Sequence, residues 1–190
     1  MGLVTMNENE IIEFAKLVGR LKKTPRTGWK IRGVKNPESV AEHSFRTALL
    51  AMLIADNEGL NANKLIRMAL LHDLEEAIIG DITTFHKEKI GKNKIIELGK
   101  KELEKHLSKL PKQLQKKYIN LWKENEEGKT KYSKLLKQID YIEMMIQCLE
   151  YQEKQPKVKK RLNVFWNRQD KIKWDPYFQK IYDTLKSMRK

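Results

Sequence analysis

Apolar residues recur three and four positions apart along nearly the whole chain, which is the period of an amphipathic α-helix. No segment shows the alternating pattern of a half-buried strand. Ser39 and Glu42 form a capping box that predicts the start of one helix, and Gly59 ends it. Segment 24–37 holds prolines and glycines and is expected to be an irregular connection. The periodic segments predict helices over 11–21, 39–56, 61–78, 92–110, 111–125 and 131–152.

These segments predict an all-α fold, a bundle of six or seven helices. We expect one domain over residues 1–190, with a core of about 10–152 and a C-terminal helical extension of about 156–190. The extension holds enough large apolar residues to pack one last helix onto the core. The helix over 61–78 is apolar on most of its sides, so we expect it at the centre of the bundle.

Length and composition narrow the class of protein. The chain has 190 residues, 40% hydrophobic and 34% charged, enough for the core of one ordinary domain. Its longest apolar run, 48–55, is far shorter than the roughly 20 residues of a transmembrane helix. The first ten residues are acidic and lack a basic segment, so we expect no signal peptide. The single cysteine, Cys148, allows no internal disulfide. We therefore expect a soluble, cytoplasmic protein without a membrane partner.

The formal net charge is +14, and a basic surface favours partners that carry phosphate. Lysines are scattered along whole predicted helices and interleaved with glutamates, as on ordinary solvated faces. No basic motif with interleaved aromatic residues accompanies the charge. Nucleic acid is therefore not expected as the main partner, and a small phosphate-bearing molecule fits better.

Charged residues appear abruptly on the otherwise apolar central helix, at His72, Asp73 and Glu76. Burying such groups without partners costs several kcal/mol each, so we expect them to be exposed, paired or bound to a metal. His43 and Asp140 lie on two other predicted helices, each beside apolar positions. Two histidines and two aspartates offer mixed nitrogen and oxygen donors, which suit Mn²⁺, Fe²⁺, Co²⁺, Ni²⁺ or Zn²⁺ better than Ca²⁺.

The helical period also predicts that the two adjacent glutamates of this segment, Glu75 and Glu76, lie on different faces of the helix. His72 and Glu76 are four residues apart and should share one face of a continuous helix. Glu75 should point away from that face, because neighbouring residues differ by roughly 100°. We expect Glu75 to be an ordinary surface residue.

The order of these residues resembles the HD-domain metal-dependent phosphohydrolases, and more narrowly their 5′-deoxynucleotidase branch. The resemblance covers about 14–166. The H…HD…D skeleton is typical of the whole superfamily, whereas the Arg-Thr-Gly-Trp and Glu-Ser-Val segments are typical of the deoxynucleotidase branch. The matching segments are 21–29, 37–43, 72–76, 80–82, 121–122, 137–140 and 149–151.

The resemblance implies a helical HD domain, a homodimer and one divalent metal ion. Its pattern assigns the ion to His43, His72, Asp73 and Asp140. Co²⁺ and Mn²⁺ are the first candidates for the ion, followed by Fe²⁺, Ni²⁺, Zn²⁺ or Mg²⁺. The implied substrates are deoxynucleoside 5′-monophosphates, which would be hydrolysed to deoxynucleosides and phosphate.

The resemblance also assigns roles around the metal. Glu76 matches the catalytic carboxylate that takes a proton from the attacking water or orients it. Asp81 matches an acidic residue that binds the deoxyribose or transfers a proton. Trp29 matches the aromatic residue that packs where a ribose 2′-hydroxyl would sit. Bacterial members have the phosphate-binding arginine directly before this tryptophan, but a glycine stands here. Arg26 is therefore assigned to phosphate by proximity, and Arg32 is its alternative.

Two other functions share much of this pattern. One is an HD-type hydrolase of cyclic nucleotides, (p)ppGpp or dNTPs, which needs more basic groups near the metal. Lys87, Lys89 and Lys92 could supply them. The other is a non-catalytic nucleotide- or nucleic-acid-binding protein that keeps the metal for structure, and the intact Glu76 argues against it.

Overall fold

The computed structural model describes residues 5–189. Within them the chain is all-α, as predicted, and its one β feature is an isolated bridge between Pro25 and Ser39. Residues 1–4 and residue 190 lie outside the described residues. The prediction about a signal peptide concerned the first ten residues and therefore falls partly on residues 1–4. The α-helices are α1 Glu8–Arg20, α2 Thr27–Ile31, α3 Val40–Asn57, α4 Ala62–Leu71, α5 Glu76–Ile79, α6 Thr84–Ile90, α7 Lys92–Leu107, α8 Lys112–Glu127, α9 Lys131–Lys154, α10 Lys159–Gln169 and α11 Pro176–Met188, with 3₁₀ turns at Leu21–Lys23 and Pro156–Val158.

The described helices outnumber the six or seven predicted, for four reasons, of which the first is that α6 forms in the segment 79–91, where no helix was predicted. The segment 24–37 is not wholly irregular, because it contains the short helix α2. The C-terminal extension forms two helices, α10 and α11, instead of one. The predicted helix over 61–78 is interrupted between α4 and α5. There the amide groups of Leu74, Glu76 and Ala77 bond to carbonyls three residues back, which tightens the backbone into successive turns.

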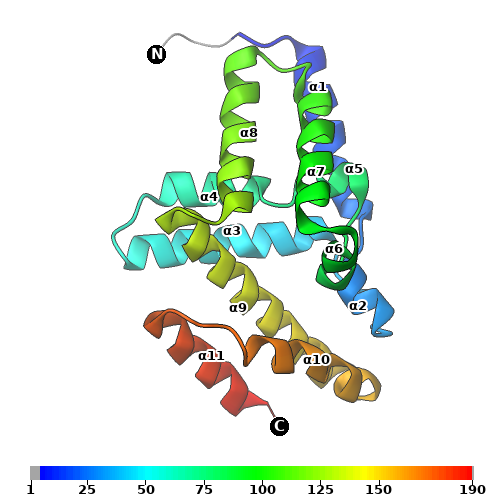
Figure 1. Cartoon of the computed structure of the whole chain (residues 1–190), viewed down its shortest axis with the longest axis vertical. Helices are drawn as coiled ribbons and strands as arrows, with labels where there is room; N and C mark the ends of the chain where they lie inside the picture. Colours follow the sequence, from blue (N-terminus) through cyan, green and yellow to red (C-terminus); the bar gives the residue numbers. More distant parts are fainter. Residues whose placement is uncertain (1–4, 190) are drawn as a thin grey trace.

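Two clusters of buried side chains hold the helices together. One joins α1, α7 and α8, at the upper end of Figure 1, to the chain around α5. The other joins α3, α4 and α9 to α10 and α11 at the lower end. Trp122 belongs to the first cluster, and Trp166 and Cys148 to the second. The two clusters adjoin along α3 and α4. On α3, Val40 belongs to the first cluster and Ala48 to the second; on α4, Leu71 belongs to the first and Met68 to the second.

The beginning of α3 is fixed as the sequence predicts. The side chain of Ser39 accepts a hydrogen bond from the Glu42 amide, and Glu42 accepts one from the Ser39 amide. Such a capping box satisfies two amide groups that the helix leaves unpaired. It sets the helical register that points His43 inward, where its side chain is fully buried.

The prediction that Glu75 is a surface residue is wrong. Glu75 is only 5% exposed, and its Oε2 accepts a hydrogen bond of 2.6 Å from the indole Nε1 of Trp122. Gly99 allows this contact, because a Cβ there would lie 3.1 Å from the Glu75 side chain and 3.3 Å from the Trp122 ring. The break after α4 turns Glu75 inward, towards a partner 47 residues away in the sequence.

In the part of the chain that the structure describes, no helix combines the length and the apolar character needed to cross a membrane. The longest, α9, carries charged residues along its whole length.

Candidate metal centre and active site

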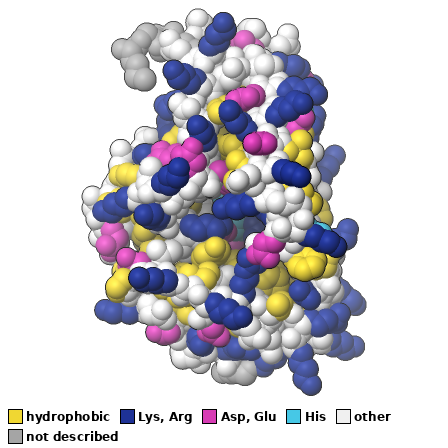
Figure 2. All heavy atoms as spheres, in the orientation of Figure 1, with side chains coloured by type: hydrophobic (Ala, Val, Ile, Leu, Met, Phe, Trp, Pro, Cys, Tyr) yellow, Lys and Arg dark blue, Asp and Glu magenta, His cyan; other side chains and the backbone are white. Residues whose placement is uncertain are grey.

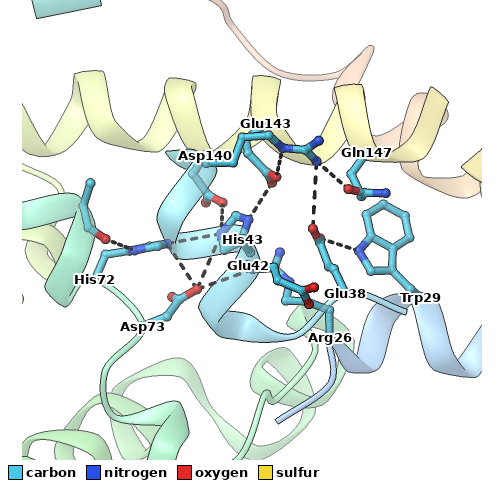
Figure 3. A network of polar contacts seen from close by, with 12 residues as sticks. Arg26, Trp29, Glu38, Glu42, His43, His72, Asp73, Asp140, Glu143 and Gln147 are labelled. Atoms are coloured by element: carbon cyan, nitrogen blue, oxygen red, sulfur yellow. Dashed lines mark hydrogen bonds and ion pairs between the residues drawn. The ribbon is translucent and has the colours of Figure 1, made fainter. Parts of the chain in front are cut away.

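Four acceptor side chains from three parts of the chain lie around Nε2 of His43 (Figure 3), and those of His43, His72 and Asp73 form one mutually close group. His43 comes from α3, His72 and Asp73 from the turn after α4, and Asp140 from α9. The Nε2 atom of His43 lies 3.3 Å from Nε2 of His72, 3.3 Å from Oδ1 of Asp140 and 3.7 Å from Oδ2 of Asp73. Nε2 of His72 lies 3.1 Å from Oδ2 of Asp73. The four residues to which the family resemblance assigns the metal are thus neighbours in the structure.

The outer ring nitrogens of the two histidines determine what the inner ones can do. Nδ1 of His72 lies 2.6 Å from the carbonyl oxygen of Ala69, which only accepts, so this nitrogen carries the proton. Nδ1 of His43 lies 2.5 Å from a carboxylate oxygen of Glu143 and donates to it in the same way. With neutral rings, both Nε2 atoms present lone pairs to the carboxylates of Asp73 and Asp140. Four acceptors facing one another without a donor form a site for a cation.

The spacing of these atoms suits a small divalent ion. Two donors at about 2.1 Å from one ion are roughly 3.0–3.4 Å apart at the angles of octahedral or tetrahedral coordination. Three of the four distances above fall in this range. The ligand atoms of His43, His72 and Asp73 all lie within 4.8 Å of one another, and Asp140 adjoins this group through His43. The donor set contains no thiolate, as expected from the sequence.

In the metal-free protein a proton takes the place of this cation. Burial and the positive charge of Arg26 act to lower the pKa of His43. Hydrogen bonds to Asp140 and Glu143 outweigh them and raise that pKa to about 9. A divalent ion at the convergence point would displace this proton, because the imidazole binds metals through its neutral nitrogen.

A buried polar network behind His43 was not anticipated from the sequence (Figure 3). Glu143 accepts from His43 and also from Nε of Arg46, at 2.7 Å. The Arg46 guanidinium also bonds Gln147 and Glu150 and lies 3.9 Å from Glu38. Glu38 in turn accepts from the Trp29 indole at 2.9 Å. One arginine thus connects the carboxylate that orients His43 with the carboxylate that holds Trp29.

A cleft of about 470 Å³ opens above the metal site. Arg26, Asp81 and Glu76 line it together with Asp73 and Asp140, whereas His43 and His72 are buried beneath it and are not part of its lining. Trp29 also lines the cleft but is only 2% exposed, so little of its surface reaches the space. Two apolar residues of the wall, Val164 and Phe165, come from the C-terminal extension, which was not expected at the site. The other apolar residues of the wall are Ile31, Ile82, Phe85, Tyr141 and Met144.

Glu76 has the environment of a proton-transferring carboxyl group. Its side chain is 5% exposed, and its Oε2 atom is buried without a hydrogen-bond partner among residues 5–189. Burial, and then the negative charges of Asp73 and Asp81, raise the pKa of Glu76 well above its ordinary value. A carboxyl group with a raised pKa that faces a cleft and keeps one oxygen without a hydrogen-bond partner can exchange a proton with water.

Asp81 fixes the helix that carries Arg26 and Trp29 to the pocket. Its Oδ2 accepts a hydrogen bond of 2.5 Å from the amide of Thr27, and its carbonyl accepts one of 2.8 Å from the Thr27 hydroxyl. Thr27 is the first residue of α2, so Asp81 binds the positive end of that short helix.

Five basic residues line the cleft. Nη1 of Arg26 lies 3.4 Å from Asp73, and Nζ of Lys137 lies 2.9 Å from Asp140. Lys87 was considered from the sequence together with Lys89 and Lys92, but only Lys87 lines the cleft. The remaining two basic residues are Arg32, the alternative to Arg26, and Arg168 from α10.

Comparison with known proteins identifies the family. Residues 18–181 match the sequence profile of the HD domain. This chain belongs to the HD domain family. An HD-domain protein of Xenopus laevis named 5′-deoxynucleotidase HDDC2 is 41% identical over 157 residues, 83% of this chain and 76% of the relative. The Dictyostelium discoideum protein of the same name is 35% identical over 189 residues, 94% of this chain and 98% of the relative.

A solved structure has the same overall fold. The conserved hypothetical protein from Pyrococcus furiosus aligns with a TM-score of 0.75 at 32% identity. The alignment covers 93% of this chain and 99% of that one. The C-terminal extension that supplies part of the pocket wall therefore largely falls within the shared fold.

Proposed function

We propose that this HD-domain protein is a metal-dependent 5′-deoxynucleotidase, which hydrolyses deoxynucleoside 5′-monophosphates to deoxynucleosides and inorganic phosphate. The observation that carries the proposal is the convergence of four acceptor atoms beside Glu76, a buried carboxyl group with one unpartnered oxygen. The printed names of the relatives from Xenopus laevis and Dictyostelium discoideum support the substrate class.

In this proposal His43, His72, Asp73 and Asp140 hold one divalent ion. Co²⁺ and Mn²⁺ are the first candidates, because two nitrogens and two carboxylates suit intermediate first-row metals. Once bound, such an ion lowers the pKa of a coordinated water and neutralises charge on the phosphate. Glu143 and the Ala69 carbonyl support the site by holding both imidazoles in the tautomer that the metal needs.

The side chains around the ion transfer protons and bind the phosphate. Glu76 takes a proton from the attacking water as its oxygen bonds to phosphorus and the bond from phosphorus to O5′ breaks. O5′ takes up a proton as it leaves, either from Asp81 or, if Asp81 instead binds the deoxyribose, from solvent water. Arg26 steadies the phosphate from its position beside Asp73.

Trp29 is the proposed wall against a ribose 2′-hydroxyl. An apolar wall rejects an added hydroxyl only about 10²-fold, and only if it cannot move aside. The Trp29 ring is held by Glu38, by Phe165 at 4.4 Å between ring centroids and by Tyr151 at 5.5 Å. This rigid support favours steric exclusion at the sugar.

A substrate panel tests the reaction class. The metal-loaded protein should release phosphate from dAMP far faster than it turns over cyclic AMP, dATP or ppGpp. Faster turnover of one of the latter would favour the alternative hydrolase, which the five basic residues of the cleft could serve. Retained metal without any turnover, together with salt-sensitive oligonucleotide binding, would favour the non-catalytic alternative.

We also propose that the protein is a homodimer that pairs through α3. Four large apolar residues follow one another at helical spacing on its outer face and are 41–64% exposed: Phe45, Leu49, Met52 and Leu53. Leu70, on the adjacent α4, is 51% exposed. Exposed apolar patches of this kind are typical of protein interfaces, and a second copy would bury the patch by symmetry.

The change Leu53→Lys tests this interface. We expect the wild-type protein to elute as a dimer in size-exclusion chromatography with light scattering, and the variant as a monomer of about 22.5 kDa. The matched control is Leu98→Lys, a change of an exposed leucine on α7, which should leave the dimer intact. A monomeric wild-type protein at tens of micromolar would contradict the proposal.

A small molecule remains the proposed partner, in preference to nucleic acid. Lys and Arg side chains on the face shown in Figure 2 are interspersed with Asp and Glu and form no continuous basic track. We further propose a cytoplasmic location, which the single buried thiol of Cys148 supports.

A further inference from the structure

Helix α6 contributes to the cleft but not to the core. None of its seven residues is buried, and Phe85 at its start is 68% exposed. The helix stands between Gly80 and Gly91, which both have positive φ angles. Its amino-terminal cap is the Thr83 side chain, which accepts from the amide of His86. One face of α6 lines the cleft, so this helix contributes side chains to the pocket and none to the core.

Lys87 is the residue of α6 that extends to the floor of the cleft. Its side chain is 31% exposed, and its Nζ lies 3.9 Å from Oε1 of Glu76. This distance is too long for a hydrogen bond, so the ammonium pairs with Glu76 by charge alone. Among residues 5–189 it makes no hydrogen bond, and all three of its N–H groups can serve a ligand.

The other cations at the floor are already engaged. Arg26 and Lys137 lie 3.4 and 2.9 Å from Asp73 and Asp140, the carboxylates proposed to bind the metal. Lys87 alone of these three pairs with the proposed base. The negative charges of Glu76 and Asp73 also outweigh burial and raise the pKa of Lys87, so it stays charged at neutral pH.

We propose that Lys87 is a further catalytic residue, which binds a non-bridging phosphate oxygen of the substrate next to Glu76. This inference rests on the proposed hydrolysis of phosphate monoesters. As water attacks phosphorus, negative charge builds up on the phosphate oxygens, and a fixed ammonium beside the base stabilises it. The same ammonium offsets the charge of ionised Glu76, which keeps the base available.

The test compares Lys87→Met with Lys89→Met, an exposed lysine of the same helix that does not line the cleft. We expect K87M to lower kcat/KM for dAMP by about 10²-fold or more, as for loss of one charge-stabilising donor. K89M should stay within twofold of wild type, and Lys87→Arg should recover part of the loss. Equal activity of K87M and K89M would overturn the proposal.

Binding in the presence of Mn²⁺ separates phosphate recognition from a structural role. K87M should bind dAMP at least about tenfold more weakly but bind deoxyadenosine, which lacks the phosphate, as wild type does. A parallel loss of affinity for both would show that Lys87 only shapes the cleft, and would overturn the proposal. If the wild-type protein bound dAMP without hydrolysing it, the proposed function would fail while this comparison still tested the contact.

Discussion

The change Glu76→Gln is expected to reduce kcat for dAMP by about 10³-fold and to leave the metal in place. Glutamine keeps the shape of the side chain but cannot take a proton from water, and such proton transfer contributes roughly 10²–10⁴ in rate. Glu76 is not one of the four converging ligands, so metal content should remain at one ion per chain. Phosphate release and elemental analysis of the same sample measure both quantities.

Glu97→Gln, on the exposed face of α7, is the matched control and should retain full activity. If E76Q kept activity within twofold of wild type, Glu76 would not be the base. Loss of metal from E76Q would instead make it a ligand.

The same variant should be more stable than the wild type when metal is absent. Burial raises the pKa of Glu76, so the folded protein holds this proton to a higher pH than the unfolded chain does. Above the unfolded pKa the free energy of unfolding therefore falls as pH rises, until Glu76 is ionised in both states. Glutamine carries no such penalty, and Tm of metal-free E76Q at pH 7 should exceed that of the wild type.

The change Asp73→Ala is expected to abolish metal binding and activity together. Oδ2 of Asp73 lies 3.1 Å from the inner nitrogen of His72 and 3.7 Å from that of His43, and it also pairs with Arg26. Loss of a residue that merely supports a ligand costs about 10–100-fold in metal affinity, so loss of a ligand should cost more than 100-fold.

Thermal shift provides an independent readout for this variant. Mn²⁺ should raise Tm of the wild-type protein, because a ligand that binds the folded state stabilises it, and should not raise Tm of D73A. Asp56→Ala, at the exposed end of α3, is the control and should respond like the wild type. A D73A protein that held one metal ion per chain would contradict the proposed site.

The long helices and the candidate metal ligands could both be picked out from the sequence, for a shared reason. Helical periodicity is a local property, and the four ligands are chemically conspicuous on apolar helices. His43 and Asp140 lie on helices that the structure has at nearly the predicted positions, α3 and α9. The convergence of their side chains requires only that these helices pack against each other.

The burial of Glu75 could not be predicted in the same way. Apolar periodicity continues through 61–78, so the sequence gives no sign of the break after α4. The break depends on contacts with distant residues, among them the hydrogen bond from Trp122 and the space left by Gly99. The helical period of a continuous helix therefore predicted, wrongly, that Glu75 lies at the surface.

The network behind His43 did leave a signal in the sequence. Arg46 follows His43 by three residues on α3, and Glu143 follows Asp140 by three on α9. Residues three apart lie on the same side of a helix, so His43 and Asp140 each had a charged neighbour on the same helix face. The contribution of Phe165 to the pocket left no such signal, because it depends on how α10 folds back onto Trp29.

Phosphate release from paired dAMP and AMP tests the central claim most directly. The protein is stripped with a chelator, assayed, and assayed again after addition of Co²⁺ or Mn²⁺. We predict no release without metal, and after resupply a release from dAMP at least about tenfold above that from AMP. Release that survives chelation, or equal release from the two nucleotides, would contradict a metal-dependent enzyme that selects deoxyribose through Trp29.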